Sequence, residues 1–329
     1  GYFAYDKYKA IYLPNVFLKA KKSDYLFIPT GSTLEDVANI LSEEGFIINK
    51  VTFEWVAEQK NYKKHVYPGR YKINNLMSNN KLVDLLRSGE QEPLRITFNN
   101  LRTKEQLASR ISNNLEADSA SLMKLLSDKD FLGNKYGMNP TSILTMFIPN
   151  TYEFYWNISS EQFLERMALE YKAYWNDERK AKAKKIGLSQ TEVSVLASIV
   201  QAEQSRHHDE KPIIAGLYIN RIKKGMLLQS DPTLVYAHGD FTINRVLNVH
   251  KEIDSPYNTY KYSGLPPGPI NLPEISSLNA VLDYQKHDFI FMCAKDDFSG
   301  YHYFAKNYDQ HLTYARKYQA ALNKRNIMK

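Results

Sequence analysis

The chain has 329 residues, of which 43% are hydrophobic and 24% charged, values typical of a folded protein long enough for two domains. Its net charge of +7 would suit nucleic acid, an anionic membrane surface or an acidic wall polymer, but no dense Lys/Arg motif accompanies it, and we expect no nucleic-acid partner. A single cysteine excludes an intrachain disulfide, and the lack of an apolar run of about 18 residues excludes a transmembrane helix in this sequence.

The first 92 residues predict a short lead-in and a small module. Residues 1–22 mix aromatic residues with Lys, and we interpret them as a membrane-proximal lead-in; because the chain begins at Gly1 without Met, we expect a signal or anchor upstream. Residues 23–92 then predict a βααβ unit, with strands at 25–28 and 69–73 and helices at 34–44 and 51–58. This pattern resembles the LysM-like module of wall-binding proteins.

Residues 93–329 predict a larger mixed domain. A helix at 80–88, still within the first module, leads into a strand at 94–98. Helical stretches at 103–132 and 160–185 lie on either side of an aromatic, Pro-broken segment, 146–156, that does not suit a helix. Near the end, 289–294 and 301–305 predict a hairpin, followed by an amphipathic helix that carries Tyr314 and Tyr318. The fold class is therefore α+β: a small LysM-like module followed by a larger domain of mixed helices and strands.

One carboxylate, Glu203, lies where a helix should be apolar. Ser189 and Glu192 form a capping-box pattern that predicts a helix start. Glu203 follows Leu196, Ile199 and Val200 by seven, four and three residues, so it shares their face of the helix. Partial burial and the negative end of the helix dipole both favour the protonated acid, as a general acid near neutral pH requires. A buried structural Glu is the alternative.

Two further segments carry polar residues. Ser230 or Asp231 is expected to cap a short helix, and Asp231 could instead be a second polar group beside Glu203. The Pro- and Gly-rich stretch 255–270 predicts a stiff loop that presents Tyr, Asn and Thr, suited either to holding a polar polymer or to a structural connection. The metal, phosphate and dinucleotide motifs that we considered do not occur, and we expect no metal and no cofactor. The 24 Tyr and 15 Phe would suit grooves for sugar rings.

Several of these motifs, in this order, resemble the YceG-like family of endolytic murein transglycosylases. The resemblance covers about residues 147–311 and is looser in the first third of the chain. It rests on six segments: 148–154 (Ile-Pro-Asn-Thr-Tyr-Glu-Phe), 196–203, 218–221 (Tyr-Ile-Asn-Arg), 228–233 (Leu-Gln-Ser-Asp-Pro-Thr), 255–260 and 264–270.

The chain departs from the family pattern at three places. Many relatives carry two acidic residues where this chain has Gln201 and Glu203, so the second position keeps the acid. Asn150 replaces a usual Asp, and residues 271–274 (Asn-Leu-Pro-Glu) replace a usual Asn-Pro-Gly. These departures concern details of the groove more than the reaction.

The resemblance implies cleavage of the β-1,4 bond between N-acetylmuramic acid and N-acetylglucosamine within glycan strands of peptidoglycan, leaving a 1,6-anhydro end. Glu203 would act first as acid and then as base, without a second carboxylate of the kind that ordinary glycosidases need. The hypothesis for the glycan-positioning residues is Tyr152, Gln229, Asp231, Tyr257, Asn258 and Thr259. The family also implies an upstream single-pass anchor in the inner membrane, a catalytic part on the periplasmic side, and cell-wall synthesis proteins as possible partners.

Two other functions fit the sequence. A lysozyme-type muramidase would use Glu203 with Asp231 or Glu153 as the second carboxylate. A non-catalytic wall-binding scaffold would rely on the LysM-like unit alone.

Overall fold

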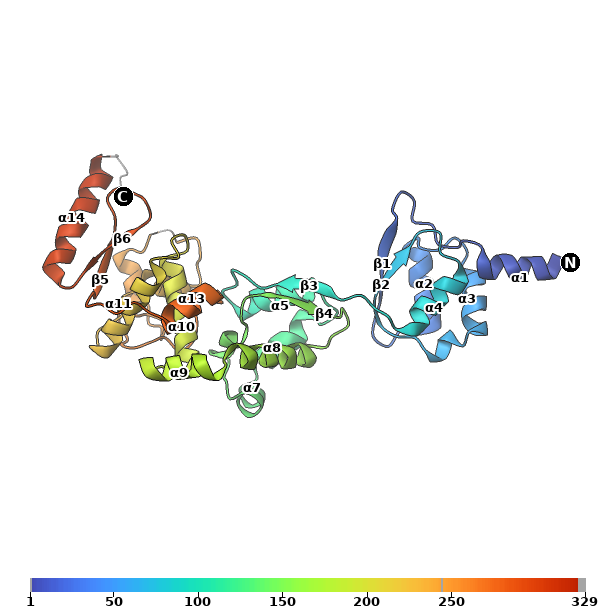
Figure 1. Ribbon diagram of the computed structural model, residues 1–329, viewed down its shortest axis with the longest axis horizontal. Helices are drawn as coiled ribbons and strands as arrows, with labels where there is room; N and C mark the ends of the chain where they lie inside the picture. Colours follow the sequence, from blue (N-terminus) through green and yellow to red (C-terminus); the bar gives the residue numbers. More distant parts are fainter. Residues whose placement is uncertain (1, 244, 325–329) are drawn as a thin grey trace. The chain divides into compact units, whose positions relative to one another are not determined.

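The computed structural model describes residues 2–243 and 245–324, which divide into two compact units. The first comprises Gly1–Ile96, Ala108–Leu122 and Thr151–Phe163, and the second comprises Thr97–Leu107, Met123–Asn150 and Leu164–Lys329. Helices predominate in Figure 1, and the strands of the described residues form three two-stranded sheets. Among these residues, no helix is both long and apolar enough to cross a bilayer.

The first unit contains the expected βααβ order. β1 pairs antiparallel with β2, and Leu26, Ile28, Tyr71 and Ile73 point into its core. A capping box between Thr33 and Asp36 begins α2. The elements are α1 (Tyr2–Tyr12), β1 (Ser23–Ile28), α2 (Leu34–Glu43), α3 (Lys50–Gln59), the 3₁₀ turn η1 (Tyr62–Lys64), β2 (Gly69–Asn74) and α4 (Asn79–Ser88). The predicted elements of this part are confirmed, whereas the LysM-like identity stays a prediction.

The helical stretches predicted at 103–132 and 160–185 are each interrupted, which corrects both predictions. Asp128 caps a new helix by accepting from the Phe131 N–H, and Asn176 does the same for Arg179 N–H. Such side-chain caps start a new helix within a sequence of good helix formers. The elements are β3 (Leu94–Thr97), α5 (Lys104–Ser112), α6 (Ser119–Ser127), α7 (Lys129–Tyr136), η2 (Ile143–Met146), β4 (Thr151–Phe154), α8 (Ser160–Tyr174) and α9 (Asp177–Ile186). The aromatic segment 146–156 is non-helical after Met146, as expected.

Helix α10 (Gln190–Glu203) is the centre of the second unit and packs against α9, α11 (Lys211–Lys223), α12 (Asp231–His238) and α13 (Ile275–Leu282). Figure 1 labels α9, α10, α11 and α13. It starts at the predicted capping box of Ser189 and Glu192. Every residue from Val193 to Gln201 is buried, Ser194 and Ser198 included. The expected apolar stripe is thus one side of a helix that is enclosed all round.

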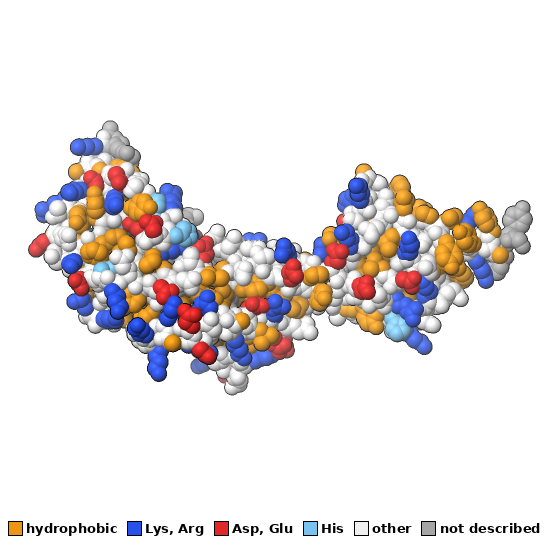
Figure 2. Space-filling view, viewed as in Figure 1, with side chains coloured by type: hydrophobic (Ala, Val, Ile, Leu, Met, Phe, Trp, Pro, Cys, Tyr) orange, Lys and Arg blue, Asp and Glu red, His pale blue; other side chains and the backbone are white. Residues whose placement is uncertain are grey.

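The rest of the second unit surrounds α10. Its elements are α11 (Lys211–Lys223), α12 (Asp231–His238), η3 (Asn248–Glu252), α13 (Ile275–Leu282), β5 (Phe291–Ala294), β6 (His302–Ala305) and α14 (Tyr308–Lys324). The predicted hairpin and final helix are confirmed. On the face drawn in Figure 2, acidic and basic side chains are interspersed and form no continuous basic tract.

Candidate active site

Glu203 is the last residue of α10, and its carboxylate is held by two hydroxyl groups. The Tyr218 Oη donates to Glu203 Oε1 at 2.7 Å, and the Ser230 Oγ donates to the same oxygen at 2.5 Å. Oε2 has no hydrogen-bond partner among residues 2–243 and 245–324. One oxygen is therefore committed to the protein, and the other is available to a reacting group.

The surroundings favour the protonated form of Glu203. Burial raises the pKa of its carboxyl, and the negative charge of Asp231 raises it further. The Ser230 and Tyr218 hydroxyls oppose this shift because they bond to the charged form, and His302 opposes it weakly. Burial is the largest of these effects, so the carboxyl holds a proton to higher pH than an exposed Glu. The residue as a whole is only partly buried, which leaves it within reach of a ligand.

Tyr218 reaches Glu203 from α11, where it is almost fully buried. Burial, followed by the adjacent Glu203 charge, raises the pKa of Tyr218 well above its usual value, so its hydroxyl keeps its hydrogen and remains a donor. Helix α11 lies close to the segment that follows α13 because Gly216 has no side chain: a Cβ there would lie 2.3 Å from the Gln285 carbonyl oxygen.

Ser230 is positioned by a tight turn and by the loop that follows η3. Gln229 adopts a positive φ of 53° and donates its N–H to the Thr259 carbonyl oxygen at 3.1 Å. The Ser230 N–H then donates to Thr259 Oγ1 at 3.0 Å. Ser230 was expected as a helix cap and does precede α12, but its hydroxyl makes no capping bond to that helix. The hydroxyl is instead free to bond Glu203.

Arg221, from helix α11, also holds this turn in place. Its buried guanidinium donates to the carbonyl oxygens of Ile290 at 2.8 Å and Leu228 at 2.6 Å, and to Gln229 Oε1 at 3.3 Å. The bonds to Leu228 and Gln229 fix the two residues that precede Ser230. Burial lowers the pKa of Arg221 from its ordinary value.

The predicted glycan-positioning residues fall into different environments. Gln229 and Asp231 are exposed, and Asp231 Oδ1 accepts from the Tyr260 hydroxyl at 2.5 Å. Tyr257 is partly buried, with its ring 4.7 Å from the Tyr236 ring centroid. Three predicted residues of the second unit therefore have surface that a ligand can touch.

Asn258 and Thr259 are buried within the loop. Asn258 is 0% exposed, and its amide donates to the carbonyl oxygens of Lys251 and Ile253 at 2.9 and 2.8 Å. Thr259 is 2% exposed and bonds Ser230 and Thr233. Both side chains are committed to shaping the loop.

Tyr152 belongs to the first unit, in strand β4. It is 6% exposed, and its ring centroid lies 6.3 Å from that of Phe154. The neighbouring Glu153, considered as a second carboxylate, is exposed and pairs with Arg95 at 3.1 Å.

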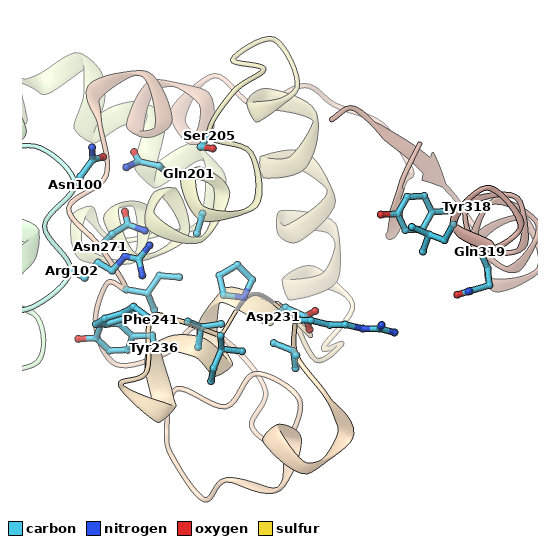
Figure 3. A pocket seen from close by; sticks show the side chains of 18 residues that line it. Asn100, Arg102, Gln201, Ser205, Asp231, Tyr236, Phe241, Asn271, Tyr318 and Gln319 are labelled. Carbon is cyan, nitrogen blue, oxygen red and sulfur yellow. The ribbon is translucent and has the colours of Figure 1, made fainter. Parts of the chain in front are cut away.

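A groove of about 1040 Å³ runs past the end of α10 (Figure 3). Ala202 and Asp231, adjacent in sequence to Glu203 and Ser230, lie in its wall, although Glu203 itself does not. Its walls come from α10, α12, the segments that follow them and α14, and include Gln201, Ser205, Tyr236, Phe241, Arg245, Asn271, Tyr318 and, from before α5, Asn100 and Arg102. The acid therefore lies beside a groove with aromatic, amide and cationic walls.

Several residues of the site had no predicted role. Tyr218 and Tyr260 lie in segments that the family resemblance had marked, but their partners are 15 and 29 residues away. Buried Glu210, in contact with His302 at 2.9 Å and Gln204 at 2.7 Å, supports the turn after α10. Among the described residues, no group of three or more His, Cys, Asp or Glu side chains is arranged to hold a metal ion.

Comparison with known proteins shows the family of the chain. The model of the YceG-like family matches residues 26–317. An endolytic murein transglycosylase of Bacillus subtilis (strain 168) is 29% identical over 313 residues, which cover 91% of this chain and 85% of that protein. A protein of the same name from Streptococcus pneumoniae serotype 2 is 26% identical, and the match covers 94% of this chain and 61% of the relative.

A solved structure gives the same result for the fold. The crystal structure of a yceG-like protein from Listeria monocytogenes superposes with a TM-score of 0.59 at 27% identity, covering 89% of this chain and 99% of the other.

Proposed function

The chain belongs to the YceG-like family, and we propose from this premise that it is an endolytic transglycosylase of peptidoglycan with Glu203 as its acid and base. One observation carries the proposal: a partly buried carboxyl with a raised pKa has one oxygen fixed by Tyr218 and Ser230 and the other open, beside a large groove. The relatives named as endolytic murein transglycosylases supply the substrate class.

The reaction begins with Glu203 as a general acid. Because Oε1 accepts two hydrogen bonds, the proton of the neutral acid resides on Oε2, which faces no protein donor. Oε2 donates this proton to the glycosidic oxygen between N-acetylmuramic acid and N-acetylglucosamine. The bond from muramic acid C1 to that oxygen breaks, and the bonding pair leaves with the N-acetylglucosamine hydroxyl.

The same carboxylate then completes the reaction as a base. It takes the proton from the muramic acid 6-hydroxyl while O6 bonds to C1, which gives the 1,6-anhydro product. Glu203 returns to its protonated state, so no water is consumed and no second carboxylate is required. The Tyr218 and Ser230 hydroxyls stabilise the negative charge that Glu203 carries between the two steps.

The predicted glycan-positioning residues have two roles in this proposal. Gln229, Asp231 and Tyr257 contact the glycan, since each has accessible surface near the acid. Asn258 and Thr259 position the loop rather than touch the substrate, because both are buried and bonded within the protein. Tyr152 stays a predicted glycan contact.

The test is digestion of purified peptidoglycan followed by mass spectrometry. Internal cleavage with products one water lighter than reducing-end muropeptides is expected, and reducing-end products alone would overturn the transglycosylase proposal. One observation favours a muramidase as the second candidate: the Asp231 carboxylate is close enough to Glu203 to raise its pKa. A Glu203→Gln variant should bind glycan without cleaving it, and cleavage by that variant would remove Glu203 from the mechanism.

The location and accessory parts are proposed on the same basis. Since peptidoglycan lies outside the cytoplasmic membrane, we propose an extracytoplasmic catalytic part tethered by a single-pass anchor in the inner membrane. Residues 23–92 would form a LysM-like module, and residues 93–329 would form the transglycosylase catalytic domain. Cell-wall synthesis proteins stay predicted partners.

A further inference from the structure

The groove contains a polar region around Arg102 and Asn271 that the proposed reaction does not use. Figure 3 draws these two side chains near each other, in the part of the groove that also holds Asn100 and Gln201. The backbone joins their neighbours, because the Leu272 N–H donates to the Leu101 carbonyl oxygen at 2.8 Å. The Arg102 N–H is itself fixed by Gln106 Oε1 at 2.7 Å.

Arg102 is an exposed cation of the groove wall without an acidic partner among the described residues. Its guanidinium carbon lies 4.6 Å from the centroid of the Phe241 ring, and the described residues offer it no carboxylate. Arg245, which also lines the groove, has no acidic partner in the same residues, and Asp231, the acid of the groove wall, is bonded to Tyr260. A planar guanidinium that is positioned but unpaired is suited to a carboxylate.

Asn271 supplies the complementary acceptor. Its Nδ2 donates to the Ser198 carbonyl oxygen at 2.8 Å, which requires the amide nitrogen on that side and leaves Oδ1 on the other. Asn271 is 8% exposed, and Oδ1 has no partner among the described residues. A buried carbonyl oxygen without a donor is uncommon in native proteins. Solvent does not reach Oδ1, so a ligand N–H bonds to it only when the amide turns toward the groove.

A ligand that contacts both groups has an N–H group near a carboxylate, as a peptide does. Each muramic acid of peptidoglycan carries a short peptide amide-linked to its lactyl group. We propose that the Arg102–Asn271 region binds this peptide stem, with Arg102 receiving a stem carboxylate and Asn271 Oδ1 accepting a stem amide hydrogen. The inference rests on the proposed function, since it takes peptidoglycan as the substrate. The enzyme would then distinguish peptide-bearing strands from bare glycan.

The experiment compares labelled glycan strands that carry peptide stems with the same strands stripped by an amidase, which keep the lactyl carboxylate. Binding is measured by fluorescence anisotropy in the non-cleaving Glu203→Gln background. Adding Arg102→Gln is expected to weaken binding of stem-bearing strands about tenfold to a hundredfold, the usual effect of losing a charge-assisted bond, and to leave stripped strands within about twofold. Arg102→Lys should fall between, since it keeps the charge without the planar fork.

The control is Arg110→Gln, because Arg110 is an exposed residue of α5 outside the groove. This variant should bind both kinds of strand as the background protein does. Equal weakening of both strands would assign Arg102 to the lactyl group or the sugar and overturn the inference, as would no effect on either. Failure of the proposed function looks different: the wild-type protein would not form anhydro products, while the binding comparison could still be made.

Discussion

The Ser230 hydroxyl donates to Glu203 Oε1 at 2.5 Å instead of capping the helix that Ser230 precedes. The cost of an uncapped helix N-terminus is about 1 kcal/mol. The same hydroxyl, together with that of Tyr218, holds one oxygen of the acid and leaves the other open. This arrangement makes the pKa and the orientation of Glu203 depend on residues that follow it by 15 and 27 positions.

Removing either hydroxyl should move the alkaline limb of the activity profile upward. Ser230→Ala and Tyr218→Phe each delete a donor that lowers the Glu203 pKa, so the acid should stay protonated to higher pH. A hydrogen bond to a charged group contributes about 1.5–3 kcal/mol, which corresponds to about one to two pH units. The measurement is kcat/KM against pH on soluble strands.

Ser205→Ala is the matched control for that series, because Ser205 lines the groove without bonding Glu203. Its alkaline limb should coincide with that of the wild-type protein. A limb that stays in place in both hydroxyl variants would contradict the assignment of Glu203 as the proton donor.

Asp231→Asn should shift the same limb in the opposite direction. The Asp231 charge raises the Glu203 pKa, so its removal should lower the pH at which the acid ionises, while Asn keeps an acceptor for Tyr260. At the acidic plateau we expect kcat/KM to fall by no more than about tenfold, the effect of losing one neutral hydrogen bond. The anhydro products should be unchanged. A muramidase that used Asp231 as its second carboxylate would instead lose nearly all activity.

Replacing the acid should make the protein more stable at neutral pH. Because the folded state raises the Glu203 pKa above 4.5, it binds more protons than the unfolded chain between that value and the folded pKa. Stability therefore falls as pH rises through this window, and the full cost persists above it. Glu203→Gln avoids this cost, which amounts to about 1.4 kcal/mol for each unit of pKa displacement.

Urea unfolding at several pH values measures this effect. The variant and the wild-type protein should agree in stability at low pH and diverge above pH 4.5, the variant being the more stable. Glu58→Gln, at an exposed position of α3, serves as the control. A stability difference between the Glu203 variant and wild type that is independent of pH would contradict the prediction.

Gly268→Ala should damage the loop that supports the groove. A Cβ at Gly268 would lie 2.0 Å from the Thr141 carbonyl oxygen and 2.8 Å from the Tyr257 hydroxyl, so the loop must move. Overpacking of this kind costs about 1–3 kcal/mol, and the displacement of Tyr257 should lower activity as well. The measurements are the unfolding free energy and kcat/KM.

Gly133→Ala is the matched control, since it places a Cβ no closer than 3.9 Å to another residue, inside helix α7. It should stabilise the protein by about 0.5–1 kcal/mol. Equal stability changes at the two glycines would show that close approach at Gly268 is unimportant.

Local sequence patterns predicted the helices and strands of this fold better than the interruptions within helical stretches and the hydrogen-bond partners of the side chains. The capping box of Ser189 and Glu192 marked the start of α10 correctly because its signals lie within four residues. The interruptions at Asp128 and Asn176 were not predicted, since each lies within a stretch of good helix formers and the cap competes only weakly with continued helix.

The site shows the same limit. The partial burial of Glu203 was predicted from helical spacing, because burial on one face depends on positions three, four and seven residues away. The role of Ser230 could not be found this way: its sequence context satisfies a helix cap, and only the tertiary fold brings its hydroxyl to Glu203. Asn258 likewise appeared to be a ligand contact, whereas its amide satisfies two backbone carbonyl groups of its own loop.

The enclosure of α10 has a consequence for how specificity can change in this protein. A helix with neighbours on every side has no room to shift, so the Glu203 carboxyl keeps one place relative to the unit that holds it. The groove walls are formed largely by loops and helix ends, where substitutions disturb few packed atoms. Under the proposed function, substitutions in those walls can therefore change substrate preference while the Glu203 chemistry stays constant.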